Sequence, residues 1–234
     1  MKKQIISMGG GGFSKWGVYS DEDRTLAHYF LQQTEKAMPA ICFLPTASAD
    51  DARYTVNFYT EFLKLSCKPS HLSLFMPETK DIESFLLEKD AIYVCGGSTK
   101  NMLALWKEWG VDKILQKALD KGIVLGGISA GMNCWYEDCV TDSLFGELTA
   151  LKCLGFLKGS GCPHYDGEAK RRPSYQALIQ EGKMGAGIAV EEHAAVHYIN
   201  GEIKQVVTTK ATSAYQVFIE NSKIVEKRLT ATRL

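Results

Sequence analysis

Apolar residues along this chain form short runs that alternate with longer amphipathic segments. The runs are rich in Ile, Val, Leu and Phe, which is typical of strands buried on both faces, and the segments between them are long enough for helices. Such alternation indicates β-α units that build a parallel sheet with helices on both sides. The predicted strands are QIISM, AICFLP, HLSLF, AIYVC and IVLGGI, and the predicted helices lie within residues 20–37, 50–66, 79–89 and 98–121, the last divided by Gly110.

The pattern changes after residue 183, where shorter apolar runs are joined by Asn200-Gly201 and by Asn221-Ser222-Lys223. Asn-Gly between two apolar runs is a hairpin signal. We therefore predict an antiparallel hairpin extension at the C-terminal edge of a mostly parallel sheet. The whole would be a three-layer α/β sandwich, in one domain that spans residues 1–234.

Glycine-rich sequences follow three of the predicted strands: MGGGGF after the first, VCGGST after the fourth and LGGISAG after the fifth. In open α/β sheets, ligands bind beyond the carboxyl ends of the strands. The first loop completes neither Gly-x-Gly-x-x-Gly nor a P-loop, so we do not expect a nucleotide there. For this loop the sequence leaves two roles open, a contact with substrate or a tight turn without chemistry.

The third loop contains Gly127-Ile128-Ser129-Ala130-Gly131, the Gly-x-Ser-x-Gly pattern of a nucleophilic serine on a strand-to-helix turn. A serine hydroxyl needs a base to take its proton and preplaced donors for the anion that it creates. Ser129 fits because a buried strand precedes it, and because the residues after it are suited to start a helix with free N–H groups.

Among the five histidines, His164 is the best candidate for the base, because it lies in the turn-rich loop GSGCPHYDGE. His28 and His71 fit structural or surface roles, and alternation in the late hairpin region can place His193 and His197 outward. The spacing leaves the orienting carboxylate open among Asp138, Asp142, Asp166, Glu168, Glu191 and Glu192. Cys162 and His164 alone do not make a metal site, so we expect neither a metal nor a cofactor.

The charge and cysteine content narrow the class of protein. The chain has 27 basic residues (Lys and Arg) and 27 acidic residues (Asp and Glu). With no net charge, no overall electrostatic field attracts nucleic acid or a membrane surface. The seven cysteines are scattered without a Cys-x-x-Cys pair, which is typical of reduced thiols. The chain shows no signal-peptide pattern and no apolar run long enough for a membrane span, so we expect a cytoplasmic protein.

Four segments in order, YVCGGSTKNMLALW, IVLGGISAGMNC, GCPHYDGE and GIAVEEHAAV, resemble the dipeptidase E and cyanophycinase family of serine peptidases. The resemblance covers nearly the whole chain and implies a class I glutamine-amidotransferase-like (flavodoxin-like) fold. It implies Ser129 as nucleophile, His164 as base and Glu192 as third member, with Glu191 one step away. It assigns the oxyanion hole to the N–H groups of Gly97 and Ala130.

The same resemblance implies a small peptide substrate, cut after an N-terminal aspartate. Arg171 and Arg172 could then receive the substrate carboxylate, although a solvated charged face explains this run as well. Asp142 could meet the substrate ammonium or merely cap a turn. The alternatives are a cyanophycinase-like or isoaspartyl peptidase, or a noncatalytic binding protein on the same scaffold. The sequence leaves a monomer and a homodimer open.

Overall fold

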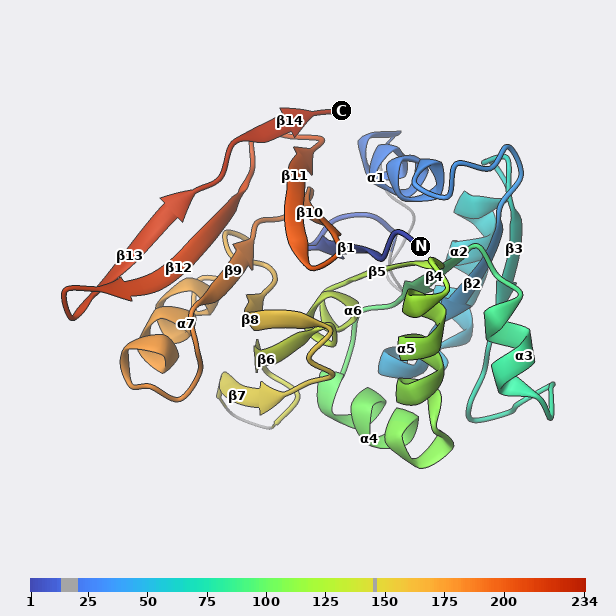
Figure 1. Ribbon diagram of the computed structural model, residues 1–234, viewed down its shortest axis with the longest axis horizontal. Coiled ribbons are helices and arrows are strands. Elements are labelled where there is room, and N and C mark those ends of the chain that lie inside the picture. Colours follow the sequence, from blue (N-terminus) through green and yellow to red (C-terminus); the bar gives the residue numbers. More distant parts are fainter. Residues whose placement is uncertain (14–20, 145–146) are drawn as a thin grey trace.

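The computed structural model describes residues 1–13, 21–144 and 147–234. Within these residues, the first sheet has eight strands in the order β14-β11-β10-β1-β5-β4-β2-β3 (Figure 1). Their bounds are β1 (Gln4–Met8), β2 (Ala40–Leu44), β3 (Lys68–His71), β4 (Ala91–Val94), β5 (Val124–Ile128), β10 (Ala194–Ile199), β11 (Glu202–Thr208) and β14 (Ala231–Arg233).

Strands β1, β5, β4, β2 and β3 run parallel to one another, and β1, β4 and β5 are buried along their whole length. These are the five strands that the apolar runs predicted, with one shift. The run HLSLF does not form the third strand, which ends at His71. The carboxylate of Asp50 accepts hydrogen bonds from the N–H groups of Leu74 and Phe75 and holds that segment as a loop.

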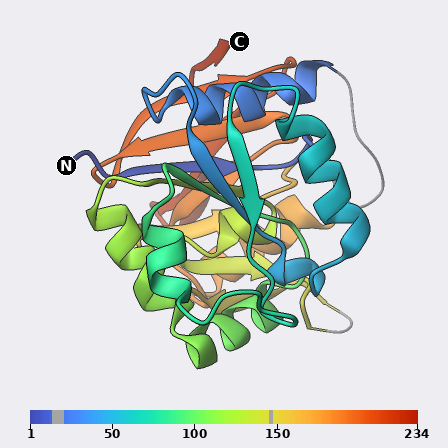
Figure 2. The same cartoon turned by 90° about the vertical axis from the view of Figure 1, so that its right-hand side faces the viewer.

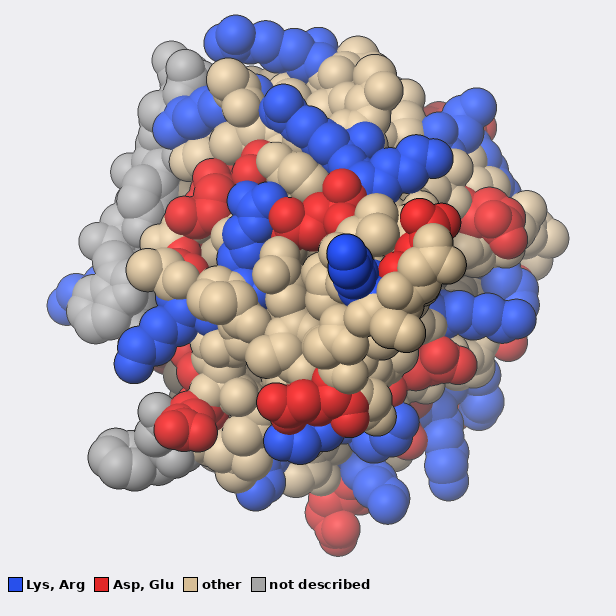
Figure 3. Space-filling model, turned by 90° about the vertical axis from the view of Figure 1, so that its left-hand side faces the viewer, with Lys and Arg blue, Asp and Glu red and all other residues tan. Residues whose placement is uncertain are grey.

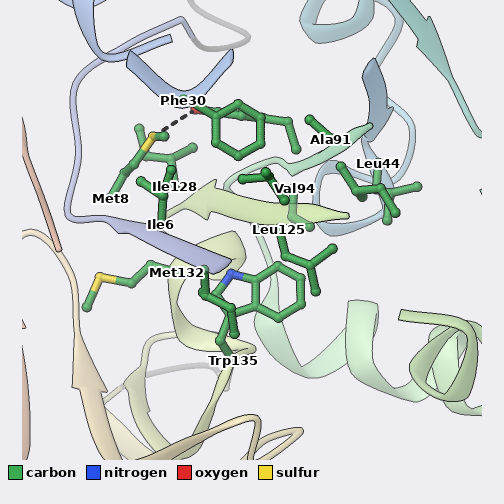
Figure 4. Close-up of a cluster of buried hydrophobic side chains, with 14 of the residues drawn as sticks. Ile6, Met8, Phe30, Leu44, Ala91, Val94, Leu125, Ile128, Met132 and Trp135 are labelled. Atoms are coloured by element: carbon green, nitrogen blue, oxygen red, sulfur yellow. Dashed lines mark hydrogen bonds between the residues drawn. The ribbon is translucent and has the colours of Figure 1, made fainter. Parts of the chain in front are cut away.

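Helices cover both faces of this sheet, as predicted (Figure 2). On one side, α1 and α2 meet the sheet through aromatic rings: Phe58 stacks on Phe43 at 4.7 Å between centroids, and Phe30 contacts Tyr93 edge to face. The core continues on both sides of β5, with Phe30 on one side and Trp135 on the other (Figure 4). The helices are α1 (Asp21–Gln32), α2 (Ala52–Phe62), α3 (Ile82–Leu87), α4 (Thr99–Trp109) and α5 (Val111–Asp120), with a short 3-10 turn at Thr46–Ser48.

Helices α4 and α5 are separated at Gly110, as the sequence predicted, and Gly110 adopts the left-handed conformation that ends α4. The predicted start of the first helix at residue 20 lies outside the described residues. In the described part of the chain, no helix combines the length and apolar character that crossing a bilayer would need.

A second sheet was not predicted from the sequence. In the described residues it has the order β13-β12-β9-β8-β6-β7, and α7 packs against it over a smaller core (Figure 1). Its early strands carry polar residues and glycines, as in LKGSGC, and therefore lack an apolar run. The bounds are α6 (Ala130–Asn133), β6 (Tyr136–Thr141), β7 (Thr149–Lys152), β8 (Leu157–Cys162), α7 (Arg171–Gln180), β9 (Gly187–Val190), β12 (Ala214–Glu220) and β13 (Lys223–Arg228).

Both predicted hairpins are present. Strands β10 and β11 turn at Asn200-Gly201, and β12 and β13 turn at Asn221-Ser222, where all four residues have positive φ. The first hairpin extends the parallel sheet, because β10 pairs antiparallel with β1. The second hairpin joins β9 in the other sheet instead. On the face that carries this hairpin and α7, acidic and basic side chains are interspersed (Figure 3).

Candidate active site

Ser129 occupies a tight turn between β5 and α6. Its backbone has φ 57° and ψ −110°, a conformation that costs an L-residue energy and that surrounding structure must hold in place. Both flanking glycines contact the same carbonyl: a Cβ atom on Gly127 would lie 2.4 Å from the oxygen of Val94, and one on Gly131 would lie 2.2 Å from it. The Gly-x-Ser-x-Gly pattern therefore lets this turn pack directly against β4.

The backbone N–H groups of Gly97 and Ala130 are among those near Ser129 that have no acceptor in the described residues. Ala130 is the first residue of α6, so its N–H has no partner within the helix. Gly97 has φ 139°, and a Cβ there would lie 2.1 Å from the carbonyl oxygen of Ala47, so only glycine fits. The neighbouring Gly96 faces the Ser129 side chain, since its Cβ would lie 3.2 Å from that of Ser129.

His164 lies in the loop between β8 and α7, where the sequence placed it. Its ring Nδ1 is 2.5 Å from Oε1 of Glu192, and both side chains are mostly buried. Because an ionised carboxylate accepts but does not donate, this contact places the histidine proton on Nδ1 and leaves Nε2 free to accept.

Glu192 follows β9, and its own N–H donates to the carboxylate of Asp166 at 2.7 Å. Burial alone would raise the pKa of the Glu192 carboxyl. The hydrogen bond and charge of His164, the charge of His193 and the N–H of Gly11 act in the opposite direction and hold the pKa below its usual value. Glu192 is therefore ionised at neutral pH and can stabilise a cationic imidazole.

Glu191 points away from this pair. One carboxylate oxygen accepts from the Ser213 N–H at 2.7 Å and the other from the Tyr215 hydroxyl at 3.1 Å, and the residue is only 9% exposed. Glu191 therefore joins the end of β9 to β12. Of the six carboxylates that the sequence left open, the structure brings Glu192 to His164.

The end of β1 and the glycine loop after it hold the backbone of the serine and of the histidine. The carbonyl of Met8 accepts from the Ser129 N–H at 3.3 Å, and the next carbonyl, that of Gly9, accepts from the His164 N–H at 3.1 Å. No hydrogen bond joins the Ser129 hydroxyl to the His164 ring among the described residues. In structures without substrate, the hydrogen bond between a nucleophile and its base is often long and shortens only when substrate binds.

The same loop also holds the glutamate. The Gly10 carbonyl accepts from the His193 N–H at 3.0 Å, which fixes the turn after Glu192. The sequence left the loop open between substrate contact and a turn without chemistry. It instead supports the three side chains, a role that no local sequence signal shows, because the partners are more than a hundred residues away.

Arg171 is buried at the start of α7 and has carboxylate partners within the chain. Its Nε and Nη2 atoms donate to Oε2 of Glu168 at 2.9 and 2.6 Å, and Nη2 lies 3.6 Å from Oδ2 of Asp142. The side chain is only 3% exposed, whereas the Asp142 side chain is 68% exposed. The positive charge of the Arg171 guanidinium is therefore already balanced by carboxylates of the same chain, beside the His164 loop.

Arg172 is bound in a similar way. It makes two hydrogen bonds to the Glu226 carboxylate on β13, and its guanidinium lies over the rings of Tyr165 and Tyr215 at 5.0 and 5.3 Å. The Tyr165 hydroxyl also donates to Glu226. Arg172 thus ties the second hairpin to the residue that follows His164.

The outward placement expected for His197 is wrong. Strand β10 lies between β1 and β11 in the middle of the sheet, so His197 is buried, with Nδ1 2.7 Å from the Tyr29 hydroxyl and Nε2 3.2 Å from Oε1 of Gln4. His193 is near the site, and its Nε2 lies 3.1 Å from Nζ of Lys210. Within the described ranges, no cluster of three or more His, Cys, Asp or Glu side chains could hold a metal ion.

A sequence model of the family described as peptidase family S51 matches residues 5–206. The chain belongs to peptidase family S51. It is a serine-type peptidase, and the resemblance seen in the four sequence motifs is confirmed. This S51 chain is 51% identical over 225 residues to a Bacillus subtilis (strain 168) protein named uncharacterized peptidase YgaJ, with 96% of each chain covered.

Two solved structures share the fold of this S51 peptidase. A peptidase from an acI-B1 actinobacterium matches with a TM-score of 0.72 at 14% identity, covering 97% of this chain and 94% of the other. A Listeria monocytogenes EGD-e protein provisionally assigned to peptidase E matches with a TM-score of 0.60 at 19% identity, covering 98% and 100%. The α/β fold class predicted from the sequence is thereby confirmed.

Proposed function

We propose that this S51 peptidase hydrolyses small peptides through an acyl-enzyme on Ser129, with His164 as base and Glu192 as its orienting partner. The observation that carries the proposal is the 2.5 Å contact between His164 and Glu192. Consecutive carbonyls at the end of β1 accept hydrogen bonds from the backbone of Ser129 and of His164. The free N–H groups of Gly97 and Ala130 supply the expected oxyanion hole.

In this mechanism the Nε2 atom of His164 takes the hydroxyl proton as the Ser129 oxygen attacks the peptide carbonyl. The N–H groups of Gly97 and Ala130 donate to the negative oxygen of the tetrahedral intermediate. The imidazolium then gives its proton to the departing amine, and Glu192 stabilises the cation while it exists. A water molecule, activated by the same histidine, hydrolyses the acyl-enzyme and regenerates Ser129.

A fluorophosphonate probe tests the nucleophile directly, because it labels an activated serine without depending on the peptide chosen. Wild-type protein is expected to be labelled at Ser129, and Ser129→Ala is not. His164→Ala is expected to lose labelling while keeping its fold by circular dichroism. Equal labelling of wild type and Ser129→Ala would remove Ser129 from the mechanism.

For the substrate, we propose a dipeptide with N-terminal aspartate, and the support is the resemblance to dipeptidase E. The two arginines that the sequence offered for the aspartyl carboxylate add little to it. Arg171 would have to release Glu168, and Arg172 would have to release Glu226.

A cyanophycinase-like or isoaspartyl activity is the second candidate, and one observation favours it. Arg171 pairs with two carboxylates, those of Asp142 and Glu168, whose side chains are 68% and 46% exposed. This group therefore keeps one net negative charge beside the His164 loop, where it could meet a basic group of a substrate. A panel of dipeptides separates the two candidates: Asp, Glu, Asn, β-Asp and neutral first residues, each with and without a C-terminal arginine, with Ser129→Ala as blank. Preference for α-Asp supports the first candidate, and preference for β-Asp-Arg supports the second.

We further propose that the protein acts in the cytoplasm, since all seven cysteines are free. Immunoblotting of cell fractions tests this, and recovery mainly outside the cytoplasmic fraction would contradict it.

A further inference from the structure

Two cysteines outside the site lie in contact across a pair of strands. Cys139 is on β6, and Cys153 directly follows β7, with which β6 pairs antiparallel. Their sulfur atoms are 3.4 Å apart. A disulfide has a sulfur–sulfur distance near 2.05 Å, so closure needs a movement of little more than about an ångström.

The two thiols differ in access. Cys153 is partly exposed, whereas Cys139 and the other five cysteines are buried. The hydrogen bond shared with Cys153, followed by burial and the neighbouring thiols, raises the pKa of the Cys139 thiol well above its usual value. A reagent in solution therefore meets Cys153 first, and Cys139 is the partner held next to it.

We propose that Cys139 and Cys153 form a reversible disulfide when the protein meets a small-molecule disulfide. The Cys153 thiolate attacks one sulfur of the reagent, forming a mixed disulfide and releasing one small thiol. Cys139 then attacks the Cys153 sulfur, and its proton passes to the small thiolate that leaves, which gives the second small thiol. The two protein thiols are oxidised, and the small disulfide is reduced to two thiols.

The bond would close the segment from Cys139 to Cys153, which contains Asp142. Cys139 is also paired in register with Gly161 on β8, the strand that leads to His164. The modification would therefore lie one strand away from the histidine loop. The proposal does not depend on the peptidase mechanism, because its test measures covalent bonds rather than turnover.

The test treats the folded full-length protein with oxidised glutathione, blocks free thiols with N-ethylmaleimide and maps the peptides by mass spectrometry. Trypsin releases Cys153 in the peptide CLGFLK, and cleavage after Glu137 separates Cys139 from the nearby Cys134. In wild type we expect the Cys153 peptide linked to the Cys139 peptide, and dithiothreitol should restore both free thiols.

Three variants give the controls. Cys134→Ser should keep the bond, whereas Cys139→Ser should stop at a glutathione adduct on Cys153. Cys153→Ser, at a partly exposed position where the fold is easily kept, should lose both products. A wild-type protein that stays unmodified at Cys153, stops at the glutathione adduct, or links Cys153 to Cys134 would overturn the proposal.

Discussion

The carboxylate of Glu192 lies against Gly10, where a Cβ atom would come within 1.9 Å of Oε2. Gly167 borders the same side chain, since its Cβ would lie 2.9 Å from Cγ of Glu192. The glutamate that holds His164 therefore occupies a space bounded by two positions without side chains. A methyl group at either position would compete with the carboxylate for that space.

Replacing Gly10 by alanine is expected to displace the Glu192 carboxylate and reduce kcat by roughly 100-fold or more, because His164 loses its orienting partner. The measurement is kcat and KM on the best dipeptide. Gly185→Ala is the matched control, since nothing lies within 4 Å of a Cβ there. Equal activity of the two variants would contradict this packing.

Replacing Glu192 and Glu191 separately by glutamine should divide catalysis from stability. Glu192→Gln is expected to lower kcat strongly, because a neutral amide cannot stabilise the imidazolium. Glu191→Gln is expected to lower the melting temperature instead, since it weakens the hydrogen bonds to Ser213 and Tyr215. The measurements are turnover and thermal unfolding of both variants. A larger loss of kcat in Glu191→Gln would show that Glu191, and not Glu192, is the partner of His164.

Replacing Ser129 by alanine is expected to reduce turnover by roughly a millionfold while the fold remains. Ser129→Gly should abolish activity equally but be more stable than Ser129→Ala by about 1 kcal/mol, because glycine adopts the positive φ of this turn without strain. Urea unfolding of the two variants measures the difference. A less stable glycine variant would show that the turn stores no strain.

Replacing His197 by glutamine should make the free energy of unfolding less dependent on pH in the acidic range. Burial, helped by Lys2 and Lys204, lowers the pKa of His197 to about 4, whereas an unfolded histidine has a pKa of about 6.5. Between these values the unfolded chain binds a proton that the folded chain does not. The free energy of unfolding therefore falls as the pH drops from about 6.5 to about 4. Melting temperatures across that range should fall less in His197→Gln, and equal slopes would count against the assignment.

The sequence predicted the parallel strands β1, β2, β4 and β5 well because they are buried and carry continuous apolar runs. It misplaced β3, which has no buried residue and no apolar run. It missed the second sheet, since strands such as LKGSGC are short and rich in glycine. The sequence singled out Ser129 and His164 through their local turns. The local sequence could not choose between Glu191 and Glu192, because the choice depends on long-range contacts. The Glu191 carboxylate faces Ser213, and the Glu192 carboxylate faces His164, 28 positions earlier.

The internal partner of Arg172 could not be predicted from the sequence either. In the sequence, a basic run beside the histidine is compatible with binding of a substrate carboxylate. In the fold, the second hairpin brings Glu226, 54 residues after Arg172, into contact with the Arg172 guanidinium. Long-range ion pairs of this kind leave no periodic signal in a single chain.

Ser129 follows a strand of the first sheet, His164 follows a strand of the second, and Glu192 lies where the chain passes from the second sheet back to the first. The separation between the proposed nucleophile and the proposed base is therefore set by how the two sheets sit against each other. A shift of one sheet against the other would change the distance between these two side chains although neither residue is altered.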